Sequence, residues 1–383
     1  MMDFFPHLGS NGIEVDAEPG SSSDHDSIRS DLTSLSESVY ANVYENGRTY
    51  HGYRPWSYVL PNDQREQDRL QVMHHIFRLF FDGEICATRL ENPQMILDIG
   101  TGTGIWAMES ANLFCYVGMF TDKAVVADQI PAAEVVGVDL SPIQPIWVPP
   151  NLRFIIDDVN QEMRFPSNSV DFIHVRGLAG SIENWSSFLQ QCYKYGRLTI
   201  PLGHVLCFQE RPGGRLEISE CRPQVHCDDG TYPDDCYLRT WVDEFNRITK
   251  IQGRTWDIMP EIQGLLEDSS FQDIHLSDNK IPIGPWAKDR KLEEIGRCFQ
   301  AQMAEDAIES YSLALFTRFG EWKLAEVQVL LAHLRSELKS NKMHIYSYLY
   351  VPTSRQLSNA NYSQQHICHG EKAGDITFII LLV

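Results

Sequence analysis

The chain contains 383 residues, of which 43% are hydrophobic and 22% are charged, a composition that allows a folded protein to bury a core. Its 32 Lys and Arg residues are outnumbered by 52 Asp and Glu residues, which gives a formal net charge of -20. Such an acidic surface repels nucleic-acid phosphates and anionic lipids, and no run of Lys or Arg forms a basic patch. We therefore expect no direct nucleic-acid partner and no membrane partner, whereas a basic protein partner stays open.

Other features bear on the compartment and on metals. The N-terminus has no basic segment followed by a long apolar stretch, as a signal peptide requires. The most apolar segment, residues 376–383, is far shorter than the roughly 20 residues of a membrane-spanning helix. The cysteines include no Cys-x-x-Cys pair, and Cys221, His226, Cys227 and Cys236 match no usual zinc spacing. These features predict a cytoplasmic protein without a metal, with the nucleus as the alternative location.

The chain begins with a polar tail and an aromatic segment. Residues 1–38 are rich in Ser, Asp and Gly and have too few apolar groups to offset the entropy of ordering, so we expect them to be disordered. Tyr and Trp residues then crowd positions 40–58. Apolar residues at helical spacing up to Phe81 predict a helix that begins near Asn62 or Asp63, with Glu66 completing a capping box if Asp63 is the N-cap.

Short apolar runs next alternate with helical segments, which indicates a parallel α/β sheet. Strands are predicted at residues 95–99, 135–140, 154–156, 170–175 and 204–209, and one of the intervening helices at residues 185–195. After residue 210 the pattern is mainly helical, near residues 234–247, 259–266, 290–319 and 324–340, with strands near residues 271–276 and 344–350. We therefore expect one α/β domain with helical elaborations.

A glycine-rich loop follows the strand predicted at residues 95–99 and opens a helix. It reads Leu97-Asp98-Ile99-Gly100-Thr101-Gly102-Thr103-Gly104-Ile105-Trp106. Alternate glycines let the backbone pass close under a ligand, and the helix N-terminus presents free N–H groups. The spacing differs from the Gly-x-Gly-x-x-Gly of dinucleotide sites, and Asp98 would repel a pyrophosphate while suiting the ammonium of an amino-acid moiety. A plain strand-to-helix turn is the alternative.

Acidic residues also end the next two predicted strands. Asp139 follows an apolar run and can accept hydrogen bonds from both hydroxyls of a ribose, as in nucleoside-binding Rossmann-like folds. Asp157 and Asp158 come after the following strand, where one of them can reach an adenine amino group, unless they form only a solvated strand end. The candidate cofactor-binding residues are Asp98, Gly100, Thr101, Gly102, Gly104, Asp139, Leu140, Asp157, Asp158 and Val159.

Several blocks together resemble the class I S-adenosylmethionine-dependent methyltransferases of the fungal LaeA-like type. They cover residues 44–51, 60–63, 68–70, 97–106, 137–145, 171–181, 228–231 and 282–286, within a resemblance that extends from about residue 40 to residue 350. The resemblance implies a Rossmann-like fold with a mostly parallel sheet of the seven-stranded type flanked by helices. It also implies S-adenosyl-L-methionine as cofactor and a role in fungal secondary metabolism.

The sequence departs from this family in three places. The turn before the predicted fifth strand reads Ile200-Pro201-Leu202-Gly203-His204, where Lys-Pro-Gly-Gly is usual. The stretch between Ala111 and Pro131 is long, and the tail after Tyr350 looks interrupted. We interpret residues 112–128 and 351–365 as translated introns or tolerated surface insertions. The expected organisation is a methyltransferase domain over residues 39–350, with a cofactor core (93–210) and a substrate-side helical elaboration (211–340), and an irregular tail over 351–383.

Methyl transfer from a sulfonium is an in-line displacement, so the protein need supply only alignment, desolvation and, for weak nucleophiles, a base. His174, at the end of the predicted fourth strand, is a candidate base, with local packing as the alternative. Arg176 is a candidate for orienting an acidic group. We therefore expect a methyltransferase that acts on an oxygen or nitrogen of a small-molecule substrate. The alternatives are a cofactor-binding nuclear regulator that works through protein partners and, disfavoured by the glycine spacing, a Rossmann dehydrogenase.

Overall fold

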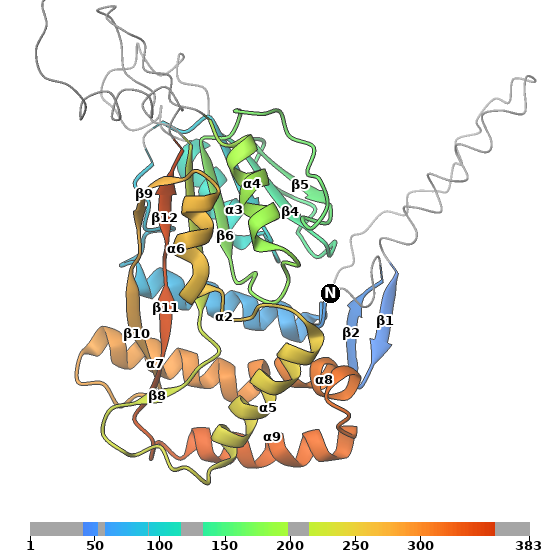
Figure 1. The fold of residues 1–383 in the computed structure, drawn as a ribbon, viewed down its shortest axis with the longest axis vertical. Coiled ribbons are helices and arrows are strands. Elements are labelled where there is room, and N and C mark those ends of the chain that lie inside the picture. Colours follow the sequence, from blue (N-terminus) through green and yellow to red (C-terminus); the bar gives the residue numbers. More distant parts are fainter. Residues whose placement is uncertain (1–40, 53–57, 91, 116–132, 198–213, 357–383) are drawn as a thin grey trace, which may run out of the picture.

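A computed structural model describes residues 41–52, 58–90, 92–115, 133–197 and 214–356 (Figure 1). The tail predicted to be disordered, residues 1–38, lies outside these ranges, as does the fifth strand predicted at residues 204–209. In the described part the chain builds a central sheet with helices on its faces and a group of helices gathered at one end of the strands (Figure 1).

The sheet contains five parallel strands in the order β7-β6-β3-β4-β5. They are β3 (Met95–Ile99), β4 (Glu134–Asp139), β5 (Leu152–Ile156), β6 (Phe172–Arg176) and β7 (Arg215–Cys221). Helices α3 (Ile105–Cys115), α4 (Trp185–Tyr195) and α6 (Met259–Asp268) pack beside it. Strands covered on both faces form continuous apolar runs, and β4 fits this rule because Val135, Val136 and Val138 are all buried.

Antiparallel strands complete the other edge of the sheet. β12 (Thr353–Arg355) lies between β7 and β9 (Gln272–His275), which gives the seven-strand order β9-β12-β7-β6-β3-β4-β5. β11 (Ile345–Tyr350) pairs with β10 (Asp278–Ile283), with β8 (His226–Cys227) and with the end of β7. The expected Rossmann-like class I fold is therefore confirmed, with β8, β10 and β11 as additions.

The remaining helices gather beyond the carboxyl ends of the parallel strands (Figure 1). They are α2 (Gln64–Phe80), α5 (Tyr237–Gln252), α7 (Arg290–Gln302), the π-helical turn η2 (Met303–Ala307), α8 (Ile308–Phe319) and α9 (Leu324–Lys339). The helices predicted near residues 234–247, 290–319 and 324–340 are confirmed. A short hairpin of β1 (Asn42–Glu45) and β2 (Arg48–His51) lies beside α2 and α8 (Figure 1).

The start of α2 confirms one half of the predicted capping box. Asp63 is the N-cap, and its carboxylate accepts a hydrogen bond from the backbone N–H of Glu66 at 3.0 Å. The side chain of Glu66 does not return to the cap. It pairs instead with Arg69, and it accepts a hydrogen bond from Ser310 of α8. Tertiary contacts therefore engage Glu66, which the local pattern predicted to complete the capping box.

The fifth parallel strand differs from the prediction. The strand beside β6 is β7, at residues where we predicted the chain to turn mainly helical. Arg211-Pro212-Gly213-Gly214 immediately precedes it and matches the turn usual in the family. The N–H of Gly214 donates to the carbonyl of Arg197 at 2.6 Å, so residues 197 and 214 are neighbours in space. Residues 198–213, between these two positions, lie outside the described residues.

The C-terminal part of the described chain also differs from the prediction. We expected an irregular tail from residue 351, but Thr353–Arg355 forms β12, an internal strand between β9 and β7. Val351, Ser354 and Gln356 are buried, so removal of residues 351–365 as an insertion would delete an internal strand. Residues 112–115 likewise belong to α3, and only the later part of the segment 112–128 lies outside the described residues.

Candidate functional site

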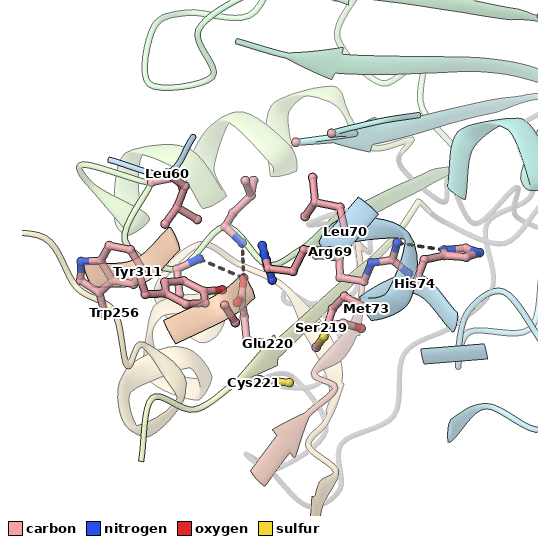
Figure 2. Close-up of a pocket in the computed structure, with 18 of the residues that line it drawn as sticks. Leu60, Arg69, Leu70, Met73, His74, Ser219, Glu220, Cys221, Trp256 and Tyr311 are labelled. Carbon is pink, nitrogen blue, oxygen red and sulfur yellow. Dashed lines mark hydrogen bonds between the residues drawn. The ribbon is translucent and has the colours of Figure 1, made fainter. Parts of the chain in front are cut away.

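A cavity of about 270 Å³ lies at the carboxyl ends of the parallel strands, the usual ligand position in open α/β sheets. One wall comes from the residues that end β3, β4, β5, β6 and β7, and the opposite wall from α2, α5, η2 and α8. Figure 2 shows Arg69, Leu70 and Met73 of α2 facing Glu220 and Tyr311 across this space. The predicted site residues line it, with the exception of Gly104: they are Asp98, Gly100, Thr101, Gly102, Asp139, Leu140, Asp157, Asp158, Val159, His174 and Arg176.

The glycine loop is held in a conformation that requires its glycines. Gly100 and Gly102 have φ values of 71° and 57°, in the left-handed region that side chains rarely adopt. A Cβ atom on Gly100 would also overlap the side chain of Leu178. The N–H of Gly102 donates to a carboxylate oxygen of Asp139 at 2.8 Å, and the other oxygen accepts from the N–H of Ser141. Asp139 therefore fixes the loop as well as facing the cavity.

Gly104 has a different role from the one predicted. Its φ is 78°, and a Cβ atom there would overlap the ring of Phe154, which packs against the loop from β5. The residue does not line the cavity. Gly104 therefore permits packing beneath the loop, while Gly100 and Gly102 form its open side.

Gly100→Ala should lower the free energy of unfolding by about 3 kcal/mol, from a strained φ and from overpacking against Leu178. The matched control is Gly253→Ala, because Gly253 has a φ of 75° and a Cβ atom added there would meet no other atom within 4 Å. The control should lose only about 1 kcal/mol, which is the cost of holding alanine at a positive φ without any steric overlap. Urea denaturation of both variants measures the difference. Equal losses would show that the Leu178 side chain moves aside without a measurable cost in stability.

Asp98 is buried, and both of its carboxylate oxygens have partners. One oxygen lies 2.7 Å from Nδ1 of His174, and the other accepts a hydrogen bond from the Thr101 hydroxyl at 2.6 Å. The His174 ring stacks on Trp106, with 3.8 Å between ring centroids and 5° between planes. These contacts favour the alternative in which His174 packs and bonds locally. They make it a positioning residue for Asp98, which keeps further acceptor sites on its oxygens.

Arg176 is a buried cation at the cavity wall. Its Nη2 lies 3.1 Å from Nδ1 of His74, and its guanidinium lies 4.8 Å from the ring centroid of Phe77. Burial lowers the pKa of Arg176. Among the described residues no carboxylate lies within ion-pair distance of it. The predicted role of Arg176, to orient an acidic group of a ligand, therefore stays a prediction.

The end of β5 forms an acidic turn on the cavity. The N–H of Asp157 donates to the carbonyl of Asp139 at 3.0 Å, which ties this turn to the end of β4. Asp158 is buried, and its carboxylate accepts from the N–H of Asn160 at 3.0 Å. The carboxylates of Asp139 and Asp158 thus meet the cavity from adjacent strands. Burial raises the pKa of Asp139 to about 6.

Sequence reasoning missed Glu220, at the end of β7. One of its carboxylate oxygens accepts hydrogen bonds from the N–H groups of Leu178 and Ala179, at 2.6 and 3.1 Å (Figure 2). Burial raises its pKa to about 7. A strand was not expected over these residues because the fifth strand was predicted at residues 204–209 and the pattern after residue 210 was interpreted as mainly helical. The sequence Arg-Pro-Gly-Gly at residues 211–214, close to the Lys-Pro-Gly-Gly usual in the family, was the signal that could have located it.

The pKa of Glu220 predicts a pH dependence of stability. An acid whose pKa rises on folding, here from 4.5 to about 7, destabilises the protein progressively as pH rises between these values. Glu220→Gln lacks this titration and its amide oxygen can still accept from Leu178 and Ala179. Relative to the wild type, the variant should therefore gain about 2.5 kcal/mol of stability between pH 5 and pH 8. Urea denaturation at both pH values measures it, and a constant difference would place the pKa of Glu220 near its ordinary value.

Aromatic side chains form the wall opposite the sheet. Trp256 meets Tyr311 and Phe245 edge to face, at centroid distances of 6.0 and 5.2 Å. The indole N–H of Trp241 donates to Ser312 at 2.7 Å, and that of Trp256 donates to Gln252 at 2.9 Å. The polar edges of both indoles are therefore satisfied within the protein, and both rings contribute apolar surface to the cavity lining.

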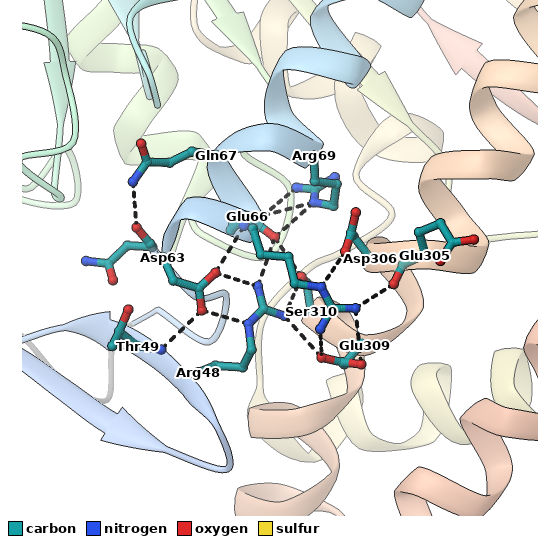
Figure 3. Close-up of polar contacts among 12 residues, drawn as sticks. Arg48, Thr49, Asp63, Glu66, Gln67, Arg69, Glu305, Asp306, Glu309 and Ser310 are labelled. Carbon is teal, nitrogen blue, oxygen red and sulfur yellow. Dashed lines mark hydrogen bonds and ion pairs between the residues drawn. The ribbon is translucent and has the colours of Figure 1, made fainter.

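A network of charged residues holds this wall in place (Figure 3). Arg48 of β2 makes two hydrogen bonds to the carboxylate of Asp63, at 2.7 and 2.8 Å. Glu66 bonds to Arg69 on α2 and to Ser310 on α8. The network thus joins the hairpin, α2 and α8, and it neutralises Arg69 beside the cavity.

The fold and the acid-bounded glycine loop define a class I methyltransferase. A family model described as a methyltransferase domain matches residues 66–276. The methyltransferase pytC of Aspergillus terreus is 38% identical over 336 residues, which cover 87% of this chain and 93% of that protein. The secondary metabolism regulator LAE1 of Cochliobolus heterostrophus is 32% identical, over 82% of this chain and 95% of that protein.

A further relative and a solved structure are also similar to this chain. The protein-methionine methyltransferase laeA of Emericella nidulans is 32% identical, over 82% of this chain and 76% of that protein. Among solved structures, phosphoethanolamine N-methyltransferase 2 of Haemonchus contortus in complex with S-adenosyl-L-methionine matches with a TM-score of 0.38 and 14% identity, over 76% of this chain and about half (52%) of that chain. The chain belongs to the LaeA-like family of S-adenosylmethionine-dependent methyltransferases.

Two observations on the described residues bear on other classes of site. Across these ranges, no three His, Cys, Asp or Glu side chains are arranged to hold a metal ion. No helix within the same part of the chain is both long enough and apolar enough to cross a bilayer.

Proposed function

We propose that the cavity holds S-adenosylmethionine across the ends of β3, β4 and β5, and that the chain methylates an oxygen or nitrogen of a small molecule in secondary metabolism. The observation that carries the proposal is the row of acids along these strand ends. Asp98 meets the ammonium of the amino-acid part, Asp139 accepts from the ribose hydroxyls, and Asp157 or Asp158 accepts from the adenine amino group, beside Leu140 and Val159.

The residues present fit this cofactor and not a dinucleotide. Gly100 and Gly102 line the cavity without side chains, so only backbone atoms of the loop face a ligand there. Asp98 lies at the glycine loop, where a dinucleotide would place its negative pyrophosphate. When bound, the cofactor supplies an activated methyl group. The protein then aligns the acceptor and excludes water behind α2, α5 and α8.

Isothermal titration calorimetry of the purified chain tests this proposal. S-adenosylmethionine and S-adenosylhomocysteine should both bind, and NAD should give no heat. Tight binding of NAD together with no heat from the sulfonium would refute it.

The names of the relatives favour a second candidate function. LAE1 is described as a regulator of secondary metabolism, so this chain would bind the cofactor and act through protein partners. Deletion of the gene distinguishes the two, because a tailoring enzyme predicts the loss of one methylated compound. A regulator predicts the loss of several unrelated compounds at once.

A further inference from the structure

Glu220 lies on the side of the cavity away from the row of acids. In the register of the sheet, Ser219 pairs with Arg176 at the end of β6, and Glu220 is the next residue. β6 separates β7 from β3, so β7 lies about 10 Å from the strand that carries Asp98. Glu220 therefore sits beyond the amino-acid end of the proposed cofactor site. That is the place where an acceptor must meet the methyl group.

Backbone N–H groups orient the carboxyl of Glu220, and one of its oxygens can still accept a hydrogen bond. The N–H groups of Leu178 and Ala179 both donate to the same oxygen, which fixes the direction of the group. Within the described ranges no side chain donates a hydrogen bond to it. The second oxygen therefore has no side-chain partner, although the residue is only 4% exposed and lines the cavity. A buried acceptor of this kind calls for a donor from a ligand.

No cation among the described residues forms an ion pair with Glu220. Arg69 of α2 is paired with Glu66, and Arg176 of β6 bonds to His74. Burial raises the pKa of Tyr311 on α8 and raises that of Cys221 to about 12, so neither carries a charge at neutral pH. No cation therefore holds Glu220 as a carboxylate, which matches its elevated pKa of about 7. A base with such a pKa can take up a proton at working pH.

The walls that face Glu220 are aromatic, and they favour a flat ligand. Tyr58, Trp241, Phe245, Trp256 and Tyr311 line the same cavity. Aromatic faces of this kind bind flat, uncharged molecules and exclude strongly hydrated ones. A flat acceptor between them would present its edge, and any hydroxyl on that edge, to Glu220.

We propose that Glu220 is the catalytic base of this chain and that its acceptor is a flat, uncharged molecule with a phenolic or enolic hydroxyl. This proposal rests on the cofactor site proposed above. The acceptor oxygen attacks the sulfonium methyl carbon while Glu220 takes the hydroxyl proton. A C–O bond forms, the C–S bond breaks, and its electron pair stays on sulfur. The products are a methyl ether, a neutral thioether and protonated Glu220, so atoms and charge balance.

The experiment compares the wild type with Glu220→Gln and with a matched control, Glu217→Gln. Glu217 lies on the same strand and is also buried, but its carboxylate accepts from the N–H groups of Ala87 and Thr88 and does not line the cavity. The probes are a naphthol and the corresponding methoxynaphthalene, which has no proton to donate. Both are titrated by fluorescence into the complex with S-adenosylhomocysteine, and methyl transfer to the naphthol is followed with a labelled methyl group.

At pH 8 the wild type and Glu217→Gln should bind the naphthol about tenfold more tightly than its ether, from one charge-assisted hydrogen bond. The preference should vanish in Glu220→Gln. Methyl transfer by the wild type should decline below about pH 7. Glu220→Gln should be slower by about 100-fold or more, without that decline.

An unchanged preference or pH profile in Glu220→Gln overturns the role of Glu220. Failure of the naphthol to bind or to accept a methyl group in the wild type overturns the acceptor class. Both results leave the cofactor site intact, provided that calorimetry shows S-adenosylmethionine binding to all three proteins. If the wild type binds no S-adenosylmethionine, the proposed function itself has failed.

Discussion

Asp139→Ala should weaken S-adenosylmethionine binding by about 100-fold or more, while leaving the protein folded. The carboxylate is expected to accept from two ribose hydroxyls, and each such charge-assisted hydrogen bond is worth about 1.5–3 kcal/mol. The variant also frees the N–H groups of Gly102 and Ser141, which Asp139 holds at 2.8 Å. Calorimetric titration measures the affinity.

The matched control for this variant is Asp171→Ala. Asp171 likewise accepts from two backbone N–H groups, those of Gln94 and Met95, but at the opposite end of the sheet from the cavity. Asp171→Ala should lose at least as much stability, since Asp171 also pairs with Arg197 at 2.8 Å, whereas only Asp139→Ala should lose affinity. Similar affinity losses in the two would assign Asp139 a purely structural role.

The same site predicts a pH dependence of cofactor binding. Burial raises the pKa of Asp139 to about 6, and only the carboxylate can accept from both hydroxyls. Affinity for S-adenosylmethionine should therefore be constant at neutral pH and should decrease as pH falls below about 6. Titrations across this range test it, and an affinity that does not change down to pH 5 would contradict it.

Arg48→Met should lower the free energy of unfolding by about 3 kcal/mol, because it removes a buried cation and leaves Asp63 without an ion-pair partner among the described residues. The Arg48 side chain is 4% exposed, and its guanidinium lies 2.7 Å from Asp63, 3.6 Å from Glu309 and 4.0 Å from Glu66 (Figure 3). Urea denaturation at neutral pH measures the loss.

Arg65→Met is the control, since Arg65 also pairs with Glu309 and with Asp306, but its side chain is 44% exposed. Water and salt screen such a pair, so we expect a loss of about 0–1 kcal/mol. Nearly equal losses from the two variants would show that burial of Arg48 does not govern the energy of the network.

Local sequence determined the cofactor side of this protein. A buried parallel strand, a glycine loop and a following helix leave their pattern within about ten residues, so Asp98, Gly100 and Gly102 were correctly placed at a strand end. Asp139 could be predicted for the same reason, because it ends the next apolar run. The N-cap at Asp63 is equally local, since it bonds to an N–H only three residues away.

Only the tertiary structure decided the part of the cavity that β7 forms. β7 contains Glu217 and Glu220, two acids that argue against a buried strand when the sequence is taken alone. The fold makes their burial possible, because backbone N–H groups about 130 and 40 residues distant in sequence donate to their carboxylates. β12 is a strand because β7 and β9 flank it, although its Thr-Ser-Arg sequence has no apolar pattern. Residues whose role depends on such distant partners, Arg69 and Glu220 above all, cannot be identified from a local pattern.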